Sequence, residues 1–235
     1  MPWPFEALLA SAAAAHGHLC PGQVVGVRMA LLGCRLIGLK CPCGPEELAK
    51  LIVYVEMDRC TADAVAHVTG VKLGRRSLKY LDYGIMAATF FNLETGQAFR
   101  IISREEARAL AGSYAPEVSD KLHRQIAAYK RMPESVLFRV QKVRLKINDL
   151  DLPGPTRRRV ACAKCGQMVR DGRERVVKGQ VFCRICAEGG YFSDAQEMVA
   201  WEEMPWAPEQ TDLQEALAAG GAGRPRRTVP GDSNG

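Results

Sequence analysis

The chain has 235 residues, which predicts one full domain together with a smaller module at about 100–200 residues per domain. Its 47% hydrophobic and 25% charged residues exclude a wholly disordered chain, because they supply enough apolar surface for a core. Its net charge is +6, and its apolar stretches are short or carry arginine, which excludes a membrane-spanning protein.

The first predicted elements are helices around one strand. Segment 23–39 is apolar on nearly all sides, which predicts a helix buried in the core, with Gly26 and Gly33 on one face where a neighbour can approach closely. Residues 51–55 are rich in β-branched side chains and predict a buried strand. Further helical segments are predicted over 5–15, 46–50 and 60–68.

The middle of the chain predicts a hairpin followed by a helix and a strand. Segments 83–92 and 97–102 flank the turn signal Glu94-Thr95-Gly96. Ser103 and Glu106 have the spacing of a capping box, which predicts a helix start. The series closes with a helix over 116–131 and a strand over 137–147. This uneven mixture of both element types predicts an α+β fold.

Composition changes after residue 148. The next eleven residues, 149–159, hold prolines, a glycine and three consecutive arginines, and we interpret them as a linker. The end of the chain is rich in Pro, Gly, Ala and polar residues, which is typical of disorder. The predicted domains are a core of helices and antiparallel sheet (1–148), the linker, a small treble-clef-like zinc finger (160–204) and a disordered tail (205–235).

Nine cysteines are the most informative count in the composition. The first fifteen residues lack the basic start of a secretory signal, so we expect a cytoplasmic protein. Disulfides are rare in that compartment, and clustered cysteines there more often bind metals or react as thiols. The odd number of cysteines also argues against a complete disulfide framework.

Two CxxC motifs near the C-terminus form the clearest cluster. Their separation of 17 residues brings four thiolates into the tetrahedron of a closed, structural zinc site, with free or redox-active cysteines as the alternative. A hairpin with its turn at Lys178-Gly179 is predicted between the motifs, and Gly166 suits the tight first knuckle. The predicted zinc ligands are Cys162, Cys165, Cys183 and Cys186.

Three arginines, Arg157 to Arg159, precede this finger. They allow contact with nucleic acid, but we favour a solvated basic linker, because the finger lacks a base-reading helix rich in Arg and Asn. Nucleic acid is therefore not an expected partner.

A second candidate site lies near the N-terminus. In the extended spacing His16-x-His18-x-Cys20, alternate side chains point the same way, so two imidazoles and a thiol face one point. Cys60 follows a predicted strand and opens a predicted helix, a common place for functional groups. These ligand types suit zinc and other late divalent metals. The alternative is an exposed histidine beside two cysteines that are buried as small hydrophobic residues.

The remaining thiols and histidines give weaker signals. Cys34 lies within an apolar helix, so we interpret it as a buried hydrophobic residue. Cys41 and Cys43 lie on a proline-flanked loop, where a labile metal site, a redox pair and a passive loop all remain open. We interpret His67 and His123 as structural or exposed.

Three motifs carry a resemblance to a known family. They are the stretch from His16 to Gly22 followed by Gly26-Val27-Arg28-Met29-Ala30, the stretch from Glu56 to Ala64 leading to Thr69-Gly70, and the stretch from Leu78 to Gly84 with Thr89-Phe90. In this order, over residues 10–148, the chain resembles the FmdE family, which takes its name from formylmethanofuran dehydrogenase.

The resemblance implies an α+β core with a metal site, a frequent C-terminal zinc finger and a homodimer. Position by position, it implies that His16, His18, Cys20 and Cys60 are the core ligands. It also implies that Asp63 is a polar partner behind a ligand. It gives no role to Asp82 and Tyr83.

The chain departs from the family pattern at two places. Val71 replaces a cysteine that many members have, and Gly74-Arg75-Arg76-Ser77 replaces a stretch with a second glycine. Arg75 keeps a positive charge there and is a candidate anion contact.

The resemblance implies an accessory or metal-handling role linked to a molybdenum or tungsten redox enzyme, which would be the partner. The alternatives are a stand-alone zinc-dependent enzyme of unknown substrate and, more weakly, a nucleic-acid-binding zinc-finger protein. The sequence does not decide whether the chain is itself an enzyme.

Overall fold

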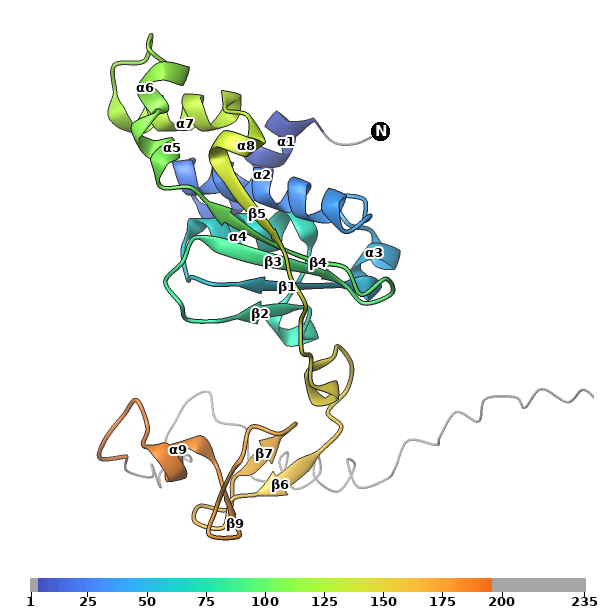
Figure 1. Cartoon of the computed structure of the whole chain (residues 1–235). Helices are drawn as coiled ribbons and strands as arrows, with labels where there is room; N and C mark the ends of the chain where they lie inside the picture. Colours follow the sequence, from blue (N-terminus) through green and yellow to red (C-terminus); the bar gives the residue numbers. More distant parts are fainter. Residues whose placement is uncertain (1–3, 196–235) are drawn as a thin grey trace, which may run out of the picture. The chain divides into compact units, whose positions relative to one another are not determined.

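The computed structural model describes residues 4–195. Its centre is a five-stranded sheet with the strand order β2-β1-β3-β4-β5 (Figure 1). Strands β1 and β2 run parallel, and the other neighbouring pairs are antiparallel. The strands are β1 (Leu51–Val55), β2 (Leu78–Tyr80), β3 (Ala87–Asn92), β4 (Ala98–Ser103) and β5 (Phe138–Lys142).

Helix α2 is the central helix of the core. It packs against β3 and β4 of the sheet and against the helices α1, α4 and α7. Figure 1 shows these helices gathered on one side of the sheet. The helices are α1 (Phe5–His16), α2 (Pro21–Leu36), α3 (Pro45–Lys50), α4 (Cys60–Thr69), α5 (Glu106–Ala109), α6 (Ala111–Tyr114), α7 (Lys121–Arg131) and α8 (Glu134–Leu137).

The hydrophobic core lies between α2 and the sheet. Val53 of β1 is paired with Phe90 of β3, and both side chains are fully buried together with Met29 of α2. Full burial of such a side chain stabilises the fold by about 1.5–3 kcal/mol. The helix predicted from its all-round apolar pattern is therefore confirmed as the core helix.

Two glycines let α2 pack closely against its neighbours. A Cβ atom on Gly33 would lie 2.3 Å from the Phe90 ring, and one on Gly26 would lie 2.6 Å from the Cβ of Ala64 in α4. A larger side chain at either position would force the elements apart. The sequence predicted close approach of one neighbour, whereas the structure has two, the sheet at Gly33 and α4 at Gly26.

The other face of the sheet carries polar side chains. Glu56 follows β1 and is 4% exposed, and its two carboxylate oxygens accept hydrogen bonds from Nε and Nη2 of Arg100 at 2.7 and 2.6 Å. Arg100 also donates to Gln141 on β5, and the nearby Glu56 carboxylate raises the pKa of the guanidinium. This bidentate pair links the outer strand β5 and β4 to the end of β1.

Several predicted boundaries are wrong, for local reasons. Residues 83–86 are not part of β3, because the backbone amides of Tyr83 and Ile85 turn back to the Glu56 carbonyl. Ser103 ends β4 and does not cap a helix. Helix α7 begins only at Lys121, after Asp120 accepts a hydrogen bond from the amide of His123. Strand β5 ends at Lys142, and the short β2 was not predicted at all.

The C-terminal part of the described chain contains two short hairpins and a helix. Lys178 and Gly179 both have positive φ, at 51° and 79°, and form the predicted turn of the second hairpin. The elements are a 3-10 helix (Asp149–Asp151), β6 (Arg159–Ala161), β7 (Met168–Arg170), β8 (Arg175–Val177), β9 (Gln180–Phe182) and α9 (Arg184–Glu188). The predicted α+β class, with a hairpin and then a helix near the cysteine quartet, is confirmed.

The chain divides into two units at the bond between Cys183 and Arg184. The domain boundaries predicted from composition stay predictions. The predicted tail over 205–235, and the end of the predicted finger at residue 204, lie outside the described residues. Among the described helices, none combines the length and the apolar character that a membrane crossing requires.

Candidate metal centres

The core site is built from three helix ends. His16 is the last residue of α1, which stops because Gly17 adopts the left-handed conformation at φ 98°. Cys20 is the N-cap of α2, with Pro21 at the first helical position, and Cys60 is the first residue of α4. The ligand atoms of His16, Cys20 and Cys60 all lie within 4.8 Å of one another. Segments about 40 residues apart thus bring one imidazole and two thiols together.

The imidazole of His16 is oriented for coordination. Its Nδ1 lies 2.9 Å from Oδ2 of Asp63, and its Nε2 is buried with no hydrogen-bond partner among the described residues. A carboxylate on one ring nitrogen fixes the proton there and leaves the lone pair of the other nitrogen free for a metal. An unpartnered buried nitrogen otherwise costs free energy, so a ligand at this atom explains the arrangement.

Two hydrogen bonds hold the starts of α2 and α4 together. Nε2 of the fully buried Gln23 donates to the Cys60 carbonyl at 2.8 Å, and the Thr61 hydroxyl donates to the Gly22 carbonyl at 3.2 Å. A Cβ atom on Gly22 would lie 2.9 Å from the Cβ of Cys60, so glycine is what permits this approach. The packing of the two helices therefore holds the two sulfurs close together.

The two thiols differ from ordinary surface cysteines. Burial raises the pKa of the Cys60 thiol, and the neighbouring Cys20 adds to this effect. A cation would reverse the balance, because two thiolates repel each other without a positive charge between them. One imidazole nitrogen and two sulfurs form a donor set that suits a late divalent metal, and the residues present fit such an ion.

His18 is not one of this group of three. Its side chain is exposed, and its ring centroid lies 4.8 Å from that of His16 at a tilt of 40°. The prediction that it supplies a fourth ligand stays a prediction. The side chain of His16 itself is 14% exposed, so the site is shielded but reachable from solvent.

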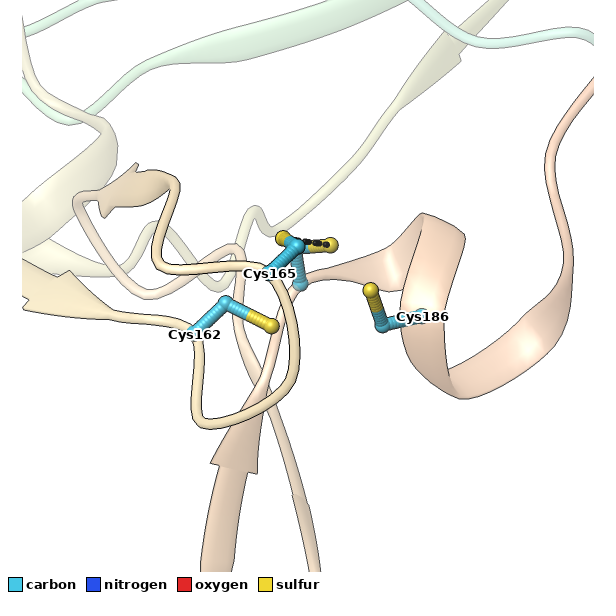
Figure 2. Close-up of side chains that lie close together, drawn as sticks. Cys162, Cys165 and Cys186 are labelled. Carbon is cyan, nitrogen blue, oxygen red and sulfur yellow. Dashed lines mark hydrogen bonds between the residues drawn. The ribbon is translucent and has the colours of Figure 1, made fainter. Parts of the chain in front are cut away.

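The predicted C-terminal cluster is present. The sulfurs of Cys162, Cys165, Cys183 and Cys186 all lie within 4.8 Å of one another, and Figure 2 shows three of these side chains turned toward a common centre. The sulfurs of Cys165 and Cys183 are 3.8 Å apart. The backbone N–H groups of Cys165 and Cys183 lower the pKa of the Cys162 thiol to about 6. Gly166, at φ 72°, makes the tight first knuckle as predicted.

Comparison with known proteins shows which family has this sequence pattern. The sequence model of the family described as "FmdE, Molybdenum formylmethanofuran dehydrogenase operon" matches residues 15–139, more than half of the chain. The chain belongs to the FmdE family.

Two further proteins are similar to this FmdE-family chain. A solved FmdE-like protein from Syntrophus aciditrophicus, named for a tungsten formylmethanofuran dehydrogenase, is 21% identical and superposes with a TM-score of 0.53. The match covers 81% of this chain and 95% of that one. A probable S-adenosyl-L-methionine-binding protein from Archaeoglobus fulgidus is 25% identical over 201 residues, 79% of this chain. The match covers 54% of that relative, so this chain spans about half of its length.

Arg75 and Arg76 lie in the stretch where this FmdE-family chain departs from the family pattern. Arg76 adopts a left-handed backbone at φ 61°, and its guanidinium bonds the Asp171 carboxylate at 2.9 Å and the Leu150 carbonyl at 2.6 Å. Arg75, the candidate anion contact, is exposed and lines a surface cavity of about 580 Å³. Its predicted anion contact stays a prediction.

The basic run and the Asp82–Tyr83 pair, singled out from the sequence, have these surroundings in the structure. The backbone amides of Arg157 and Arg158 donate to Oδ1 of Asp171 at 2.8 and 3.0 Å, so the basic run is anchored through its main chain. Tyr83 is 63% exposed, and Asp82 bonds the hydroxyl of Tyr80, whose pKa is raised mainly by desolvation.

A third thiol group was not predicted. The sulfurs of Cys34, Cys41 and Cys43 all lie within 4.8 Å of one another. Thiol hydrogen bonds from Cys34 and then Cys41 lower the pKa of Cys43 to about 4. Cys34 is fully buried, as expected, but it is also part of this cluster. The spacings of six and one residues between the three cysteines match no common metal motif, so only the proline-flanked pair gave a signal.

Proposed function

We propose that this FmdE-family protein binds a late divalent metal, Zn²⁺ first among them, through His16, Cys20 and Cys60. We further propose that it handles this metal as an accessory to a molybdenum or tungsten redox enzyme. In this proposal the four-cysteine cluster holds a structural zinc. One observation carries the core site: the buried, unpartnered Nε2 of His16 beside two thiols.

The donor set supports handling of the metal in preference to permanent storage. Three protein ligands leave a position for water, a substrate or a ligand from another protein, whereas a structural zinc site has four protein ligands. Partial exposure of the site supports the same interpretation, because an exchanging ligand needs access. His18, from the adjacent loop, is the natural fourth ligand when the position is closed.

The redox-enzyme link rests on the relatives. The family description names a molybdenum formylmethanofuran dehydrogenase operon, and the Syntrophus protein is named for a tungsten formylmethanofuran dehydrogenase. Isolation of a tagged chain at its native expression level tests this link. We expect molybdenum or tungsten to co-purify with it, whereas a protein isolated alone and free of both metals contradicts the accessory role.

Asp63, which contacts His16, provides a test of the metal-handling role. Asp63→Asn removes the charge that holds His16 in place, and loss of such a partner typically lowers metal affinity by about 10–100-fold. We expect the core metal to leave the variant faster for a chromophoric chelator. His16 is retained, so metal binding is weakened but not abolished.

A matched control is available on the preceding loop. Asp58 is an exposed carboxylate close to the same helix start, and Asp58→Asn is expected to release metal at the wild-type rate. If Asp63→Asn and Asp58→Asn release metal alike, the Asp63 carboxylate does not hold His16 for coordination, and this support for the proposed handling site is lost.

A further inference from the structure

Three cysteines outside both sites described above meet at the end of helix α2. Cys34 lies in the last turns of α2 and has no exposed surface, while Cys41 and Cys43 lie on the loop that leads to α3 and are partly buried. The loop turns back after Leu36, so that the sulfurs of Cys34 and Cys43 are 3.8 Å apart. All three sulfurs lie within 4.8 Å of one another.

This spacing is that of ligands around one ion. Sulfurs bound to a single cation at about 2.3 Å lie roughly 3.7–4.0 Å apart in trigonal or tetrahedral geometry. A disulfide requires a sulfur–sulfur distance of about 2.05 Å. The sulfurs of Cys34 and Cys43 are thus already at the separation that an intervening metal needs, and a disulfide would require them to move together.

Within the described residues, the group consists of three thiols. The Cys41 thiol faces the Val68 carbonyl at 4.0 Å and the Cys43 thiol faces the Lys40 carbonyl at 3.3 Å, so both are held by main chain. Three sulfurs without an imidazole or a carboxylate in the group favour soft cations, because thiolate ligands select Cu⁺ and Zn²⁺ over Mg²⁺ or Ca²⁺.

A surface cavity gives access to the cluster at Cys43. Cys43 lines the surface cavity of about 580 Å³, together with Arg75, Ser77 and Pro153. An ion can enter there, and the cavity leaves room for a fourth, exchangeable ligand next to Cys43. The exposed Arg75 also lines this cavity, and its positive charge would lessen the negative charge that three thiolates leave around a monovalent ion.

We propose that Cys34, Cys41 and Cys43 form a further metal site, a three-thiolate site for a thiophilic cation. Binding displaces the protons of those thiols that still carry one, which pass to solvent, and forms three metal–sulfur bonds without any change of oxidation state. With Cu⁺ the three sulfurs complete a trigonal site, whereas Zn²⁺ takes a water molecule from the cavity as its fourth ligand. This proposal does not depend on the proposed function of the core site.

Metal counting on the full chain tests the proposal. Protein stripped under reducing, anaerobic conditions is loaded with Zn²⁺ in one arm. In the other arm, one equivalent of Cu⁺ is added to the zinc-loaded protein. We expect Cys43→Ser and Cys41→Ser each to hold one equivalent of metal less than the wild type in at least one arm, the arm whose cation the site binds. X-ray absorption of that bound metal is expected to show sulfur ligands for wild type and their partial loss in the variants.

The controls separate this site from the other two. Cys20→Ala and Cys165→Ser each remove a different equivalent, so that combining either with Cys43→Ser is expected to subtract independently. Cys43 is on a loop and partly exposed, so its replacement is expected to keep the helical circular dichroism of the wild type. Unchanged metal content of both loop variants in both arms overturns the proposal. A Cys34–Cys43 disulfide that persists in freshly isolated protein overturns it as well.

Discussion

Cys20→Ala is expected to leave the protein one metal equivalent below the wild type, with the metal of the four-cysteine cluster retained. The variant leaves the core site with only His16 and Cys60, and two ligands hold a divalent ion far less tightly than three. Cys20 makes no side-chain capping hydrogen bond at the start of α2, so alanine is not expected to unfold the helix. Elemental analysis after gel filtration measures the loss.

The second cysteine cluster provides the matched control. Cys165→Ser is expected to remove a different equivalent, and the double variant to lose both, because the two sites share no ligand. Thermal unfolding followed by circular dichroism checks that each variant is folded before its metal is counted. Equal metal content in Cys20→Ala and wild type would show that Cys20 does not bind a metal.

Glu56→Ala is expected to cause the largest loss of stability of any single replacement on the polar face of the sheet. The variant leaves Arg100 without its bidentate partner, and breaking a buried ion pair costs about 3–5 kcal/mol. Arg100 is 24% exposed and can regain water, so we expect about 3 kcal/mol, the lower end of that range. Urea unfolding of metal-loaded protein measures the change.

Two further variants sharpen this measurement. Glu56→Gln keeps hydrogen-bonding atoms in place and is expected to lose less than Glu56→Ala. Glu94→Ala removes an exposed partner of Lys50 and is expected to leave the unfolding midpoint almost unchanged. If Glu56→Ala and Glu94→Ala unfold at the same urea concentration, the Glu56–Arg100 pair does not stabilise the sheet.

The elements that were predicted correctly are those with a strong local pattern. Four of the five residues of β1 and most of the apolar residues of α2 are buried, as the sequence pattern indicates. Strand β2 has three residues and forms because Leu78 pairs with Val53, a contact set by tertiary structure. The segment 116–120 is helical in pattern but not in structure, because Asp120 caps the helix that follows it.

The metal-ligand candidates also divide into those set by local spacing and those set by tertiary contacts. Two CxxC motifs hold their sulfurs close through short-range geometry, so the spacing predicts the cluster before any fold is known. The orientation of His16 depends on Asp63, 47 positions later, and only the family resemblance pointed to that partner. Cys34 meets Cys41 and Cys43 because the loop folds back on α2, and no periodicity encodes such a reversal.

Arg76, in the short connection before β2, combines a strained backbone with contacts to residues far along the chain. A non-glycine residue in the left-handed region carries a strain of about 1–2 kcal/mol, which glycine would avoid. In return, its largely buried guanidinium ties this connection to Asp171 and to the Leu150 carbonyl. The stretch around Asp171 is therefore held by this ion pair as well as by any zinc bound at the four-cysteine cluster. Removal of that zinc with a chelator would then loosen the part that carries the cysteines, while Asp171 stays attached to Arg76.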